Sequence, residues 1–221
     1  SREAQDEFAV RSMQRALDAQ AKGAFTDEIA PVSITTRRGT HMVTNDEGPD
    51  ANKLEKIGRL KPAFSPDGTV TPGNASSISD GASSLILMTA DVAAKHSIRP
   101  LARIKAHATH AGPPEAFITA PIHAIQKVLT RAGWNTHDVD LYEINEAFAV
   151  VTLAAMQALE LNPECVNIHG GACALGHPIG ASGARILVTL IHALKQQQCA
   201  RGIAALCIGG GEATAIAIEC L

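Results

Sequence analysis

The apolar positions at the start of the chain repeat with the period of an α-helix. Residues 1–23 carry one apolar stripe, with Ser1 as a favoured N-cap type and Gly23 as a favoured helix stop. The stripe consists of Phe8, Val10, Met13 and Leu17. This pattern predicts one amphipathic helix over the first 23 residues.

From residue 25 to about residue 72 the pattern is irregular. A short strand is predicted over 29–36, and the segment 53–61 is rich in lysine and arginine. Basic runs of this length are usually solvated faces, so we favour that interpretation over a phosphate contact. We therefore expect this stretch to form a loop-rich subdomain.

Beyond residue 72, apolar strand-like runs alternate with helical patterns. The predicted strands cover 82–90, 101–110, 140–146 and 166–171, followed by one that starts at 202 and one over 213–221; 82–90 reads as a buried strand. The predicted helices cover 91–97, 122–134, 147–160 and 185–196. Such alternation predicts an α/β fold with a mostly parallel sheet, helices on both faces, and a site where strands lead into loops.

Composition narrows the class of protein further. The 221 residues are 46% hydrophobic and only 3% aromatic, and the formal net charge is -3. No long basic run with interleaved aromatic residues favours nucleic-acid binding, and no apolar run of about 18 residues predicts a membrane span. The five cysteines form no C-x-x-C pair, so we expect neither a disulfide framework nor a metal site. A reducing, cytoplasmic location is the default expectation.

Three glycine-punctuated loops follow predicted strands: 145–149, 169–183 and 207–215. They bring an amide (Asn145), an imidazole (His177), a thiol (Cys207) and consecutive backbone donors from Gly209 onward to one sheet edge. Taken singly, each has a structural explanation as a helix cap, a loop histidine or a small buried residue. The phosphate-loop, dinucleotide and nucleophile-elbow patterns are all absent.

Taken together, these loops resemble a known family. NEAFA at 145–149, NIHGGACALGHPIGASGAR at 167–185 and CIGGG at 207–211 are similar to the three C-terminal motifs of thiolases, and GTVTPGNASSISDGAS at 68–83 is similar to their substrate-binding stretch. The resemblance covers essentially the whole chain. It implies the C-terminal half of a layered thiolase fold, with a mixed five-stranded sheet and helices on both faces. Residues 1–72 would end the loop domain and 73–221 would form the C-terminal domain.

The resemblance also implies a reaction. Thiolases of the acetyl-CoA acetyltransferase type condense two acetyl-CoA molecules to acetoacetyl-CoA and CoA, or run the reverse thiolysis. Cys207 would be the general base, with its pKa lowered by nearby donors, while His177 and a water held by Asn145 would stabilise the enolate oxygen. His177 would also activate the nucleophile, and the Gly209 amide would contribute to an oxyanion hole.

By the same resemblance, Ser76, Phe64, Ala147 and Phe148 would line the path of coenzyme A. The CoA thioesters are substrates, and no permanently bound cofactor is expected. None of the five cysteines matches the nucleophile motif of the family, which lies in an N-terminal half. The expected partners are therefore that half, in the same or a separate chain, and further copies in a dimer or tetramer.

Two alternatives remain open. One is a noncatalytic CoA-binding module of thiolase fold. The other is a relative of the ketoacyl synthases, which share the fold but are expected to place histidine where this chain has Cys207; the CIGGG motif argues against it. The helix over 147–160 is apolar on nearly every face, which predicts a central position that requires a covering partner on both sides.

Overall fold

The computed structural model describes residues 1–221 and begins with the predicted helix. Helix α1 spans Arg2–Ala21, and its N-cap Ser1 accepts a hydrogen bond from the Ala4 amide at 3.3 Å. The chain leaves the helix through Gly23, whose φ of 70° lies in the left-handed region where glycine is favoured. The amphipathic prediction is confirmed, because the predicted apolar residues Phe8 and Met13 are buried.

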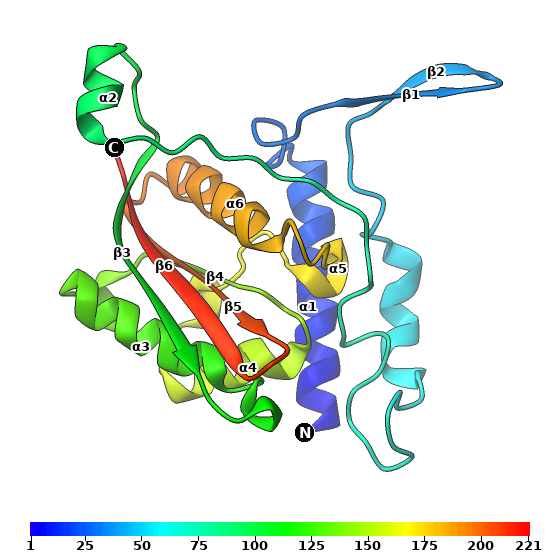
Figure 1. Ribbon diagram of the computed structural model, residues 1–221. Helices are drawn as coiled ribbons and strands as arrows, with labels where there is room; N and C mark the ends of the chain where they lie inside the picture. The colour runs from blue at the N-terminus through cyan, green and yellow to red at the C-terminus, as the bar shows by residue number, and fades with distance from the viewer.

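A two-stranded hairpin follows the helix and projects away from the rest of the molecule (Figure 1). Strand β1 (Val32–Thr36) corresponds to the predicted strand, and it pairs antiparallel with β2 (Gly39–Val43), which the sequence pattern did not predict. Every residue of both strands is exposed. The 3₁₀-helix η1 (Ala51–Arg59) then buries Ile57.

The prediction of a buried strand over 82–90 was wrong. Residues 82–89 form no regular element, and Ile86 is 85% exposed. A strand requires a neighbour to accept and donate its backbone hydrogen bonds, and no strand of this chain lies beside the segment. The segment passes over α6 instead (Figure 1). Leu85 packs against the apolar cluster to which α6 contributes Ile186 and Leu187. The short helix α2 (Ala90–Lys95) follows as predicted.

The main sheet has four strands in the order β3-β6-β5-β4. They are β3 (Ala102–Ala111), β4 (Leu141–Ile144), β5 (Arg201–Ile208) and β6 (Glu212–Cys220). Only β4 and β5 are parallel, whereas β6 is antiparallel to both β5 and β3. The sheet is mixed, as the resemblance implied, and not mostly parallel, because β5 and β6 are joined directly by a short glycine turn instead of a crossover helix.

The predicted strand over 166–171 is reduced to a single parallel bridge between Tyr142 and Val166. At Asn167 the backbone turns to a φ of 49° and leaves the sheet. The side-chain amide of Asn167 then replaces the missing strand: it donates to the Ile144 carbonyl and accepts from the Ile144 amide, both at 2.8 Å. The sheet was expected to have five strands, but it has four, and the Asn167 side chain makes hydrogen bonds that a fifth strand would have made.

Helices cover both faces of the sheet, as predicted (Figure 1). On one face lies α6 (Ser182–Gln197), and on the other lie α3 (Ala120–Ala132) and α4 (Ala149–Ala158). Short helical segments are η2 (Pro114–Ala116), η3 (Thr136–Asp138), η4 (Pro163–Cys165) and α5 (Ala172–Leu175). No helix combines the length and apolarity needed to cross a bilayer.

Part of the cover that α4 was expected to require comes from this chain itself. Helix α1 and helix α3 both pack against α4, and Val151 and Ala155 are fully buried. The most exposed large apolar side chains lie in irregular segments instead: Ile78 is 99%, Ile86 85% and Ile179 80% exposed. The side of α4 that carries Val150, Leu153 and Ala154 is only half-buried, so this chain covers the helix in part.

Candidate active site

The amide and the thiol predicted to act lie at the same edge of the sheet. Asn145 directly follows β4, and its backbone N–H donates to the Ala205 carbonyl of β5 at 2.9 Å. Cys207 lies two residues further along β5. Because β4 and β5 are parallel, both residues emerge at the carboxyl ends of neighbouring strands, where α/β sheets commonly place their sites. Both are buried, Asn145 being 1% and Cys207 7% exposed.

His177 from the long glycine-containing loop contacts Asn145. The Nε2 atom of the imidazole lies 3.3 Å from Asn145 Nδ2, and Nδ1 lies 2.5 Å from Ser182 Oγ. Ser182 in turn donates to the Pro178 carbonyl at 3.0 Å, so its oxygen is the acceptor for an Nδ1–H of the histidine. This network assigns the Nδ1–H tautomer and leaves the Nε2 lone pair facing the amide.

Burial favours the neutral form of this histidine. Desolvation is the main cause that lowers the pKa of His177, and the positive charge of Arg185 lowers it further. A neutral imidazole whose Nε2 atom carries the lone pair can accept a proton there once the Asn145 amide gives way. Asn145 adds a buried Oδ1 atom that has no hydrogen-bond partner within the chain.

The environment of Cys207 corrects one expectation. Burial raises the pKa of the thiol, and a backbone hydrogen bond lowers it by a smaller amount. The prediction that nearby donors hold this pKa below its ordinary value is therefore wrong for the 221 residues described here. No cationic side chain contributes to the shift, and desolvation of a thiolate is costly without one.

The glycine turn of the third loop leaves backbone amides free. Gly209 is exposed, and its N–H donates no hydrogen bond within the chain. Gly211 closes the turn with a φ of 94°, and a Cβ at this position would lie 2.5 Å from the carbonyl oxygens of both Gly112 and Pro113. Only glycine fits so close to the backbone, so the turn that presents the Gly209 amide depends on Gly211.

The four residues expected along the CoA path also lie together. Ser76 Oγ donates to the Ala147 carbonyl at 3.0 Å, and the Ser76 amide donates to the same oxygen at 3.1 Å. The ring of Phe148 makes an edge contact with Phe64 at 6.3 Å between centroids, and Phe64 is 79% exposed. Phe117 makes a second edge contact with Phe148 at 6.1 Å. Sequence reasoning missed Phe117, whose segment carries none of the recognised motifs.

A short extended segment connects these two groups of residues. Within residues 75–78, Ala75 forms a β-bridge with Phe148, and Ile78 forms a β-bridge with His177. The His177 amide also donates to the Ser77 carbonyl at 3.0 Å. The aromatic cluster and the imidazole are thus held by the same backbone, which fixes their spacing.

Behind the site lies a buried carboxylate that the sequence analysis did not single out. Glu146 is fully buried and accepts hydrogen bonds from Ser12 Oγ at 2.7 Å, Asn167 Nδ2 at 2.8 Å and the Cys173 amide at 3.0 Å. A Cβ on Gly171 would lie 2.4 Å from the Glu146 carboxyl carbon. Its place inside the NEAFA motif was the available signal. Through these hydrogen bonds the Glu146 carboxylate connects helix α1 and the second loop to the chain next to Asn145.

Comparison with known proteins gives these features a context. The family model "Thiolase, N-terminal domain" matches residues 1–91, and "Thiolase, C-terminal domain" matches residues 98–220. The cytosolic acetyl-CoA acetyltransferase of Mus musculus is 50% identical over 222 residues, covering 99% of this chain and 56% of the mouse protein. The chain thus spans about half the length of the curated relatives it matches.

Solved structures of thiolases have the same fold as this chain. The crystal structure of the Bacillus anthracis acetyl-CoA acetyltransferase superposes with a TM-score of 0.97 at 46% identity, covering 100% of this chain and 56% of that one. The Acat5 thiolase from Ascaris suum, solved in complex with coenzyme A, has a TM-score of 0.89 at 41% identity over the same shares of the two chains. The α/β architecture, the three loop motifs and these matches lead to one conclusion: the chain belongs to the thiolase family.

Proposed function

We propose that this chain supplies the enolate-forming part of an acetyl-CoA acetyltransferase site, which works when joined to an N-terminal thiolase half. The observation that carries the proposal is the contact between His177 and Asn145 at the sheet edge where Cys207 emerges. In this proposal the Cys207 thiolate removes a proton from the methyl group of acetyl-CoA. The enolate carbon then attacks the carbonyl carbon of an acyl group held as a thioester, so that the new C–C bond forms, the C–S bond breaks and the thiolate that carried the acyl group is released.

His177 has a separate task in the acyl-transfer step. Its Nε2 lone pair accepts the proton of the acyl-accepting thiol, because Nδ1–H is held by Ser182. The Nε2–H formed in this way then donates to the thioester oxygen as negative charge develops there. Asn145 extends the set of donors through its amide, and the exposed Gly209 N–H is free to serve the acyl-enzyme oxyanion.

The raised pKa of Cys207 has a consequence for this scheme. A thiol with a raised pKa is a stronger base once ionised, but a smaller fraction is ionised at neutral pH. The condensation rate should therefore continue to rise with pH above the ordinary titration range of a thiol. A rate that levels off below that range would contradict the assignment of Cys207 as the base.

The decisive experiment uses the complete enzyme with Cys207→Ser. Removing a positioned base typically lowers the rate about 100- to 10,000-fold, so condensation should fall by that factor. Acyl-enzyme formation, followed by intact mass, should survive because it does not use this base. Cys199→Ser is a matched control outside the site, and His177→Asn should damage both steps. Equal loss of both half-reactions in Cys207→Ser would show that Cys207 has another role.

A second candidate is a CoA-binding module without catalysis. The observation that favours it is the assembly of Ser76, Ala147, Phe148 and Phe64 within this chain alone. Coenzyme A should then raise the melting temperature of the chain, since a ligand that binds only the folded state stabilises it. Stabilisation by CoA in a complete protein that performs no condensation would favour this candidate over the enzyme.

A further inference from the structure

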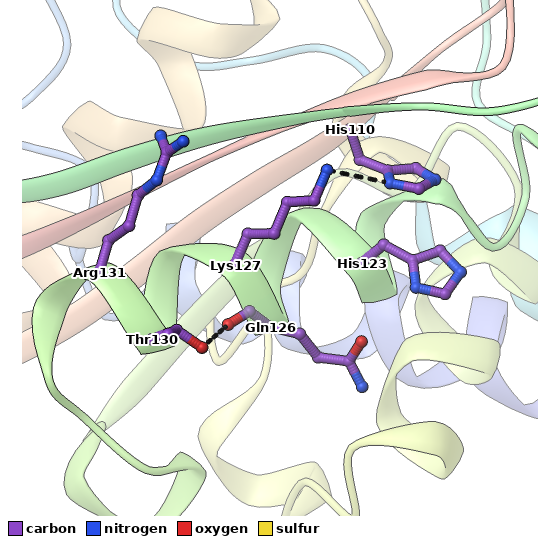
Figure 2. Close-up of a pocket in the computed structure, with 6 residues that line it drawn as sticks. All are labelled: His110, His123, Gln126, Lys127, Thr130 and Arg131. Atoms are coloured by element: carbon purple, nitrogen blue, oxygen red, sulfur yellow. Dashed lines mark hydrogen bonds between the residues drawn. The ribbon is translucent and has the colours of Figure 1, made fainter.

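A hollow lined only by polar side chains lies on the face of the sheet opposite α6. It has a volume of about 450 Å³ and lies between the end of β3 and helix α3 (Figure 2). The residues that line it are His110, His123, Gln126, Lys127, Thr130 and Arg131. None of them belongs to the proposed active site, and none is a carboxylate.

The helical repeat explains why these side chains gather. His123, Lys127 and Arg131 are spaced by four residues, so they follow one another along one face of α3. His110 approaches from the carboxyl end of β3, and its ring stacks obliquely on His123 with 4.5 Å between centroids. Figure 2 shows Lys127 reaching towards His110 and Arg131 reaching towards β3.

Backbone carbonyls of β3 hold the two cationic heads. Lys127 Nζ donates to the Thr109 carbonyl at 3.2 Å and lies 3.3 Å from His110 Nδ1, while Arg131 Nη1 donates to the His107 carbonyl at 2.6 Å. An ammonium has three donors and a guanidinium five, so both retain free N–H groups. None of the ion pairs in the structure involves either side chain.

The concentration of positive charge also affects the imidazole. The pKa of His110 is lowered by desolvation first and then by the neighbouring His123 and Lys127. Like charges held this close repel one another, and an anion among them would remove the repulsion. Carboxylates perform this role at most basic clusters, but this hollow contains none.

We propose that this hollow binds a phosphate group. A tetrahedral dianion matches a guanidinium fork, an ammonium and ring N–H donors that converge from a helix and a strand. The bound group is free inorganic phosphate or a phosphate monoester on a larger molecule, and both present the same oxygens. The site is independent of the proposed acyl transfer, since it shares no residue with the CoA path or the sheet-edge residues.

The test is NMR titration of the histidine Cε1–H signals with inorganic phosphate, against sodium chloride at matched ionic strength. Phosphate should shift the His110 and His123 signals saturably and raise the pKa of His110. The double variant Lys127→Gln, Arg131→Gln should weaken phosphate binding at least about tenfold, because two charge-assisted contacts are lost. Lys95→Gln on the exposed helix α2 is the control and should bind as the parent does.

Two further arms identify the source of the phosphate. If CoA shifts His110 and dephospho-CoA does not, the group recognised is a phosphate monoester; if only inorganic phosphate does, it is the free ion. Equal shifts in chloride and phosphate, or phosphate binding unchanged in the double variant, would overturn the proposal. Circular dichroism of the double variant identifies misfolding, and the single variant Lys127→Gln then provides the same comparison.

Discussion

Removing the hydroxyl of Ser182 tests the assigned tautomer of His177. In Ser182→Ala the Nδ1–H of His177 loses its acceptor, 2.5 Å away, while the Pro178 carbonyl loses the hydroxyl donor but keeps the amides of residues 181 and 182. Ser182 is 1% exposed, so water does not easily replace the missing oxygen. The imidazole is then free to move its proton to Nε2, which removes the lone pair that the proposed acyl-transfer step requires.

The size of the effect follows from the cost of an unpaired buried donor. Leaving such a group without a partner costs about 1–3 kcal/mol, and about 1.4 kcal/mol corresponds to tenfold in an equilibrium. The population of the working tautomer should therefore fall between about fivefold and about 150-fold, and kcat of the complete enzyme should fall with it. KM for the CoA substrate should stay nearly constant, because Ser182 is not among the residues of the CoA path.

The assay combines steady-state kinetics with long-range ¹H–¹⁵N correlation spectra, which distinguish the two imidazole tautomers. Ser182→Thr retains a hydroxyl and should recover part of the lost rate, while Ser33→Ala on the exposed hairpin is the matched control. A kcat within twofold of the parent, together with an unchanged His177 tautomer, would refute the reasoning. A lower kcat with the tautomer unchanged would show that Ser182 acts only through packing.

Three other outcomes are expected. The purified 221-residue chain should show no thiolysis of acetoacetyl-CoA, because no cysteine in it matches the acyl-accepting motif; turnover by a homogeneous sample would contradict this. Gly171→Ala should cost about 1–3 kcal/mol in urea unfolding, because its Cβ would meet the Glu146 carboxyl at 2.4 Å, whereas Gly180→Ala, with nothing within 4 Å, should be neutral. Burial raises the pKa of Glu28 to about 7 and that of Glu143 to about 8, so the melting temperature should fall as pH rises from about 5 to 8. Glu28→Gln should weaken that dependence, and a melting temperature that rises over this range would show the sign to be wrong.

Sequence patterns within short segments were sufficient to predict the helices and strands that depend mainly on those segments. The helix after Ser1, the helix predicted over 122–134 and the strand predicted over 101–110 are all present, with ends that differ by one or two residues from the prediction. The contact between Asn145 and His177 followed from glycine-rich loops placed after strands. For Asn145 and Cys207 the rule that loops after adjacent parallel strands meet at one edge is sufficient.

Features that depend on distant parts of the chain were not predictable in this way. The apolar run over 82–90 has the composition of a strand, but strand formation depends on a neighbour that no local window reveals. The pKa of Cys207 depends on which charges surround it in space, and the loop motif alone gave no sign that none would be near. Glu146 was overlooked because its three donors come from three separate segments.

The Asn167 side chain has a consequence for how the molecule meets other chains. By occupying both backbone groups of Ile144, it blocks the hydrogen-bonding positions that a foreign strand would use to extend the sheet beyond β4. Asn167→Ala would restore an open edge beside a run of buried apolar residues, which is the usual template for cross-β aggregation. A single side-chain amide thus closes this edge of the sheet and also donates a hydrogen bond to the Glu146 carboxylate.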